Sequence, residues 1–262
     1  MLAALCAALS LRAEEPFRRG EVAHYQWFAA GRARVLDTYL SPREYGGPSL
    51  GLVHLSERLA RWGGGHVSVQ GLYTGHAGYL TAAGDDGREW EGLLSGAVAW
   101  HYNWLPAPGL RVGAGGMAEL ATGFTYNTRN GNNPAQGRLD LWLGLSAVAD
   151  WHFRLRNLPM GLRVQADVPF VGAMFTPNYG QSYYEIFSLG HYDRNVRLTH
   201  PLNAPSARLL AALQIPVAGA VLSIGYLGDV RQADVNHLKR HLWNHQLMIG
   251  YVRTLQILRP RH

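Results

Sequence analysis

Apolar residues occupy every second position over long stretches of this chain. The clearest stretch runs from Arg138 to Arg156, where Leu139 begins a row of alternating apolar side chains that ends at Leu155. A repeat of two residues indicates a β-strand with one apolar face and one polar face. Strands of soluble proteins have about 5–6 residues, whereas a tilted strand needs about 9–11 residues to cross a membrane. The pattern therefore favours a transmembrane β-barrel.

The same alternation predicts about ten strands, separated by turns that are alternately short and long. The predicted strands are 34–40, a second one that ends near 61, 66–80, 90–104, 110–126, 138–156, 160–175, 206–215, 220–231 and 240–257. Pro42–Pro48, with two glycines, predicts the first turn. We expect an all-β, antiparallel, up-and-down barrel of ten strands, or of twelve if residues 176–204 add a hairpin.

Composition agrees with this class of protein. Hydrophobic residues make up 47% of the chain and charged residues only 16%, against roughly 25% charged residues in soluble domains. Mean hydropathy is only −0.11, and no apolar run reaches the roughly 18 residues that a membrane-spanning helix requires. A helical membrane protein is therefore excluded.

The chain divides into four parts by its pattern. Residues 1–13, with the apolar run Leu2–Leu11, predict a secretory signal peptide, so the lone Cys6 would be removed and no disulfide framework is expected. Residues 14–32 lack a clear period and are interpreted as a periplasmic lead-in. The barrel would then cover residues 33–258, and residues 259–262 would form a basic tail.

The basic residues are almost all arginine. The net charge is +6, and Lys239 is the single lysine. Arginine binds phosphate in a bidentate manner, so outer-membrane lipid and lipopolysaccharide are expected partners, together with the barrel-assembly machinery during insertion. Because the arginines are scattered, nucleic acid is not expected to bind. The expected location is the bacterial outer membrane.

The polar faces of the predicted strands carry charges of both signs. Placed inward, they form a polar network of His76, Glu91, His101, Arg111, Glu119, Arg138, Asp140, Arg163 and Asp167. Buried charges persist when they are paired, and a barrel of eight to ten strands has little spare interior. We therefore expect a lumen filled by side chains, with Arg138, Asp140 and Glu119 paired inside it.

Aromatic residues cluster near the ends of several strands. Such rings gather at the two membrane–water interfaces of a barrel. The expected interface residues are Trp100, Tyr102, Trp104, Trp151, Trp243 and Tyr251.

Hydrolytic chemistry would need a serine nucleophile, a histidine base and a carboxylate. The candidates are Ser182, His191 and Glu185 in the long loop, with Asp150 and His152 in the lumen. Ser182 lacks the Gly-x-Ser-x-Gly context of a nucleophile elbow. His237, His241 and His245 have helical spacing but fall in a loop and a strand, so we expect no metal site and no cofactor.

Three motifs resemble a known family. They are Leu36–Tyr45 followed by Gly47–Leu50, Asn127–Pro134, and Tyr179–Phe187. They are similar to a Bacteroidetes-type outer-membrane barrel family that is catalogued as a domain of unknown function. The resemblance covers residues 34–257 and implies a barrel and an outer-membrane location, with no catalytic residues. The chain departs from barrels in general because it ends on Arg259–His262; Tyr251 is the nearest candidate for a terminal aromatic signal.

The expected function is therefore non-catalytic: a structural role, surface binding or narrow-solute passage. One alternative is an outer-membrane lipid hydrolase of the phospholipase or lipid A deacylase type. A second is a soluble, lipocalin-like binding barrel, which predicts strands of ordinary length around an apolar interior.

Overall fold

The computed structural model describes residues 20–84 and 87–256. The predicted signal peptide, residues 14–19 of the predicted lead-in and the basic tail lie outside these ranges. No helix in the described part is long and apolar enough to cross a membrane.

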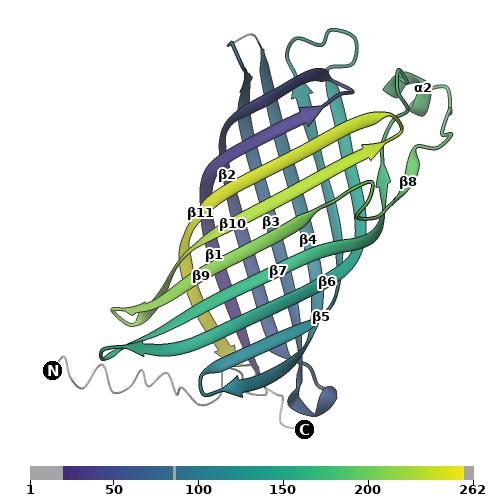
Figure 1. Ribbon diagram of the computed structural model, residues 1–262. Coiled ribbons are helices and arrows are strands. Elements are labelled where there is room, and N and C mark those ends of the chain that lie inside the picture. Colours follow the sequence, from purple (N-terminus) through teal and green to yellow (C-terminus); the bar gives the residue numbers. More distant parts are fainter. Residues whose placement is uncertain (1–19, 85–86, 257–262) are drawn as a thin grey trace.

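Eleven antiparallel strands form one sheet that closes on itself (Figure 1). Their bounds are β1 Glu21–Asp37, β2 Ser41–Leu59, β3 Val67–Ala82, β4 Arg88–Ala107, β5 Leu110–Asn127, β6 Ala135–Leu155, β7 Leu158–Phe175, β8 Val196–Thr199, β9 Ala207–Val217, β10 Ala220–Val235 and β11 Leu238–Gln256. Strands β1–β7 and β9–β11 make a ring, which β1 closes by pairing with β11. The predicted ten-stranded transmembrane barrel is confirmed.

Residues 176–206 do not add the hairpin that twelve strands would require. They contain a short helix, α2 (Tyr183–Phe187), and the four-residue strand β8. The ladder between β7 and β9 covers only residues 161–167 of β7. Strand β8 pairs with residues 172–175 of β7, nearer the end of that strand. Strand β8 therefore supplies β7 with a partner where β9 is too short.

Two predictions about the start of the barrel were wrong. Residues 21–32 are not a lead-in, because they form most of β1. The inward face of β1 carries apolar residues such as Tyr25 and Trp27, both buried, and His24 and Gln26 alternate with them on the other face. This reverses the polar-inside pattern of the other strands and hides the repeat.

The first turn is also displaced from its predicted place. It lies at residues 38–40, and the predicted turn Pro42–Pro48 is part of β2. The ladder between β2 and β3 omits Gly47 and Pro48. Proline has no N–H to donate and is tolerated at such interruptions.

The turns at the two ends of the barrel differ. At one end, two-residue turns join β4 to β5, β6 to β7 and β9 to β10. The same end holds the start of β1 and the end of β11, where Glu21 pairs with Gln256. The other end carries the longer segments 128–134 and 176–206. It also has the hairpin Asn236–His237, whose positive φ angles of 56° and 61° suit a two-residue turn. We call these the short-turn end and the long-loop end.

Aromatic residues ring the outside near both ends. Tyr79, Trp90 and Tyr126 face one another across β3, β4 and β5 toward the long-loop end. Trp100, Tyr102 and Trp104 lie on β4 toward the short-turn end, each 42–49% exposed. Trp90 and Trp100 are ten residues apart on one strand, roughly 33 Å. A tilt of about 40° reduces this to about 25 Å, the height of a barrel's apolar band.

The other predicted interface residues also face outward. Trp151 and Tyr251 are 47% and 39% exposed, and Trp243 is half-buried and stacked on His241. Exposed leucines at 139, 141, 143 and 145 fill the band between the rings. Strands of this length around a charged interior exclude the lipocalin-like alternative.

Candidate functional site

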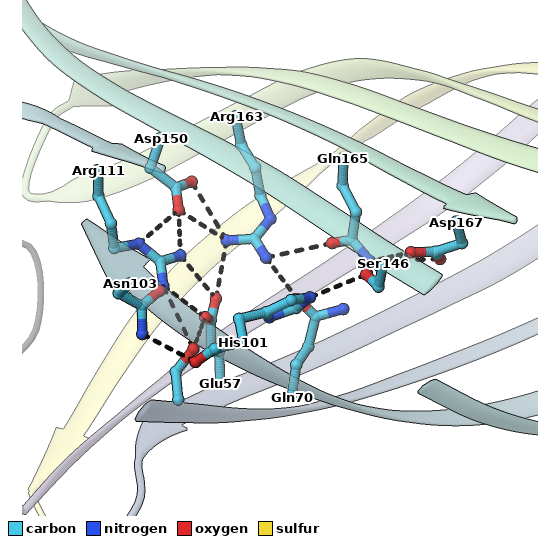
Figure 2. A network of polar contacts seen from close by, with 11 residues as sticks. Glu57, Gln70, His101, Asn103, Arg111, Ser146, Asp150, Arg163, Gln165 and Asp167 are labelled. Carbon is cyan, nitrogen blue, oxygen red and sulfur yellow. Dashed lines mark hydrogen bonds and ion pairs between the residues drawn. The ribbon is translucent and has the colours of Figure 1, made fainter. Parts of the chain in front are cut away.

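The interior of the barrel is filled by ion pairs. Toward the short-turn end, Glu57 on β2 accepts two hydrogen bonds from Arg111 on β5, at 2.7 and 3.1 Å. It also pairs with Arg163 on β7 at 2.9 Å. Asp150 on β6 contacts the same two guanidinium groups. Two cations and two anions therefore balance one another, and Glu57 links one wall of the barrel to the opposite wall (Figure 2).

Neutral side chains complete the hydrogen bonding of this group. Arg163 also donates to Gln70 at 2.5 Å and to Gln165 at 3.2 Å. Gln165 in turn donates to Asp167 at 3.0 Å. Glu57 and Arg163 are both 0% exposed, so the group is sealed from solvent.

A second group lies nearer the middle of the barrel. Arg208 on β9 pairs with Glu119 at 2.9 Å and with Asp167 at 2.8 Å. Arg231 on β10 pairs with the same Glu119 and, at 3.1 Å, with Asp229. Asp167 also accepts a hydrogen bond from Gln165, so polar contacts join the first two groups along the lumen.

A third group lies toward the long-loop end. Asp140 pairs with Arg240 at 3.0 Å. Glu91 lies 3.2 Å from His76 and 3.6 Å from Arg138. Asp140, Glu91 and Arg138 are buried, and the Arg240 side chain is 13% exposed.

All nine side chains of the predicted polar network lie inside the barrel, but one predicted set of partners was wrong. Arg138, Asp140 and Glu119 point into the lumen without pairing with one another. Arg138 and Asp140 are two residues apart on β6, whereas the partners of Asp140 and Glu119 project from the facing strands β9–β11.

Sequence reasoning missed Glu57, Arg208, Asp229, Arg231 and Arg240. The facing of Glu57 is ambiguous in the sequence because Arg58 follows it, and both are charged. Asp229 and Arg231 share a strand face two residues apart, which is a usable signal. Arg208 and Arg240 lie close to strand ends, where alternation is too short to assign a face.

Little space is left among these groups. One luminal cavity of about 20 Å³ lies between Glu119, Asp140 and Arg231. Another, of about 10 Å³, lies between Asp37, Gln136 and Arg240. A single water needs about 10–15 Å³, so each cavity holds about one water molecule.

The serine of the predicted hydrolytic site has a structural role. Ser182 caps the N-terminus of α2: its hydroxyl accepts from the Glu185 N–H at 3.2 Å, and its own N–H donates to the Glu185 carboxylate at 2.7 Å. The hydrogen bonds that the Ser182 N–H and hydroxyl donate to this carboxylate hold the pKa of Glu185 below its usual value. Within the described part of the chain, no imidazole hydrogen-bonds to Ser182, and His191 is exposed.

The luminal pair of catalytic candidates is not assembled either. Asp150 forms ion pairs with Arg111 and Arg163. Over residues 20–84 and 87–256, it makes no hydrogen bond with His152. Over the same ranges, no three His, Cys, Asp or Glu side chains lie together as a metal site would require.

The helix α2 is fixed to the rim of the barrel through Tyr183. Its hydroxyl accepts from the Gly137 N–H at 2.6 Å and donates to Gln136 at 2.9 Å. Its ring packs edge-on against Tyr39. Burial raises the pKa of Tyr39 to about 12 and raises that of Tyr183.

Known structures share this architecture. Outer membrane protease OmpT from Escherichia coli is similar over 92% of this chain and 99% of its own, with a TM-score of 0.51 and 8% identity. The translocator domain of autotransporter NalP from Neisseria meningitidis covers 95% of this chain and 92% of its own, with a TM-score of 0.42 and 10% identity. At 8% identity, the likeness to OmpT shows the fold alone.

No curated protein matches the sequence. A family match, however, extends over residues 2–262. The chain thus has the fold of outer-membrane β-barrels and belongs to the family described as "Protein of unknown function (DUF3316)".

Proposed function

We propose that this protein is a closed barrel that displays the segment 176–206 at the cell surface, in a structural or surface-binding role. The observation that carries the proposal is the series of ion-paired groups that occupies the lumen from the short-turn end to the long-loop end. Most of its charged groups are paired and buried, and the cavities between them hold about one water each. Ions and solutes would have to break these pairs in order to pass.

The displayed segment has internal order of its own. Asn195 donates to the Gln181 side chain at 2.7 Å, and Asn178 donates to the Asp193 carbonyl at 2.8 Å. Around this framework, Tyr184, Phe187 and Tyr192 are each more than 60% exposed. Ordered, exposed aromatic side chains are typical of a binding surface.

The proposed setting is the outer membrane of a Bacteroidetes-type bacterium, reached by way of a signal peptide and the barrel-assembly machinery. The family resemblance of the loop motifs and the apolar run Leu2–Leu11 support this setting. The capping role of Ser182 favours a non-catalytic protein over a lipid hydrolase.

Epitope insertion in intact cells tests the display. One epitope is placed after Gly190, in the exposed loop, and a matched epitope is placed after Gly219, in the turn between β9 and β10. Both glycines have a positive φ in exposed turns. Antibody should label the first epitope on intact cells and the second only after the outer membrane is permeabilised. The reverse pattern, or labelling at neither site in intact cells, would refute the proposal.

A further inference from the structure

Two arginines face the membrane on the outside of the barrel. Arg32 and Arg34 lie on β1, two residues apart on the same outward face, and both are exposed. Within the described residues, neither guanidinium has a hydrogen bond or a carboxylate partner. An arginine on the lipid-facing side costs about 2–4 kcal/mol at mid-membrane but about 0–1 kcal/mol near the interface. The depth of this pair in the membrane therefore determines which part of a lipid it can contact.

The register places the pair at the long-loop interface. Arg34 and Arg32 precede the end of β1, at Asp37, by three and five residues. Arg34 pairs across β1 and β11 with Trp243, a residue of the predicted aromatic band. On β3–β6, outward positions near this level include the aromatic or apolar residues Tyr79, Trp90, Tyr126 and Leu139.

A histidine adds a hydrogen-bond donor beside the arginines. His245 lies directly across the ladder from Arg32. Its Nδ1 is 2.6 Å from the Tyr226 hydroxyl, and the two rings stack. When the tyrosine donates this hydrogen bond, Nε2 carries the ring proton and can donate to an anion. Toward the loops, Glu44 is the nearby carboxylate, and it contacts His241 at 3.0 Å.

An apolar groove lies on the membrane side of the arginines, deeper along β1. It has a volume of about 1110 Å³ and is lined by Phe28, Leu52, Tyr73, Leu94 and Ile249 among others. Phe28 is four residues from Arg32 on the same face of β1, roughly 13 Å along the strand. Gly75 keeps the groove open, since a Cβ there would lie 2.8 Å from the Leu94 side chain.

We propose that this surface binds a phosphorylated glycolipid of the outer leaflet, of the lipid A type. Its phosphate would contact Arg32, Arg34 and His245, and its acyl chains would lie in the groove. Arginine forks match phosphate oxygens, and the groove matches hydrocarbon chains. The inference rests on the proposed orientation, in which the long-loop end faces the cell exterior.

Native mass spectrometry of the refolded protein in detergent tests this site. The probes are bisphosphorylated lipid A and the same lipid after removal of its phosphates. The double variant Arg32→Gln/Arg34→Gln should lose about tenfold in affinity for the phosphorylated lipid, since charge-assisted bonds are lost. Affinity for the dephosphorylated lipid should stay unchanged.

The matched control removes two exposed outward arginines near the short-turn end, as Arg58→Gln/Arg253→Gln. It should bind within twofold of the original protein. Equal losses in both double variants would refute a defined site, as would no loss in the first one. Competition by a few millimolar inorganic phosphate would refute the lipid as the ligand.

A third variant tests the groove. Gly75→Leu should weaken the binding of both lipids equally and leave the preference for the phosphorylated lipid intact. Unchanged binding would refute the proposal that the acyl chains lie in the groove. Heat-modifiable mobility on a gel confirms that each variant folds. The assay in detergent does not depend on orientation, so its failure and the failure of surface display are separate results.

Discussion

Glu57 is the residue on which the luminal network depends most. It accepts hydrogen bonds from Arg111, Arg163 and Ser68, and it is fully buried. Glu57→Gln keeps the size of the side chain but removes its charge. Two buried guanidinium groups would then share the single carboxylate of Asp150.

The expected cost follows from this charge imbalance. Breaking a buried ion pair by removing one partner costs about 3–5 kcal/mol, because the remaining charge is buried without compensation. Adding Arg163→Gln to Glu57→Gln restores neutrality and leaves the pair of Arg111 with Asp150. The double variant should therefore lose clearly less stability than the sum of the two single variants.

Urea unfolding of the protein in lipid vesicles, followed by tryptophan fluorescence, measures these free energies. The matched control is Glu44→Gln, an exposed carboxylate 3.0 Å from His241. Surface pairs contribute about 0–1 kcal/mol, so the control should unfold nearly as the original protein does. A cost below about 1 kcal/mol for Glu57→Gln, or additive losses in the double variant, would refute the account of the network.

Three further predictions concern the surface segment and the barrel wall. Tyr183→Phe removes the bond to Gly137, worth about 1 kcal/mol, and should speed trypsin cleavage at Arg194; an unchanged rate would contradict the anchoring of α2. Because the pKa of Glu185 is lowered in the fold, its cap is fully present above the ordinary pKa of about 4.3 and weakens as pH falls through the lower, folded value. Hydrogen exchange in α2 should then rise in acid, and Glu185→Gln should abolish this pH dependence. Gly172→Ala would place a Cβ 2.3 Å from the Leu141 carbonyl, and it should lower the urea midpoint, whereas Gly131→Ala, in open space, should not.

The sequence predicts most of the barrel because lipid and lumen impose opposite polarities on alternate residues. The row from Leu139 to Leu155 lies within β6, and the luminal side chains at Arg138, Asp140 and Asp150 are buried as expected. The rule fails in β1, where Tyr25 and Trp27 point inward. There apolar side chains face the lumen, and the polarity of the residues in the sequence does not distinguish the two faces of the strand.

The luminal pairs could not be read from the sequence. The pairing of Glu57 with Arg163 joins residues 106 apart, and it depends on closure of the whole ring. A one-residue change in register would turn either side chain outward. The helix α2 is a different case, because Ser182 and Glu185 carry the spacing of a capping box. That signal is readable, and the structure shows that it marks a helix start.

Single-channel conductance of the refolded protein in planar bilayers tests the central claim most directly. The account predicts a protein that inserts, shows heat-modifiable mobility and gives no steady openings, because the ion pairs of Glu57, Glu119 and Asp140 close the lumen. Steady openings of the unmodified protein would contradict a closed barrel and would make it a pore.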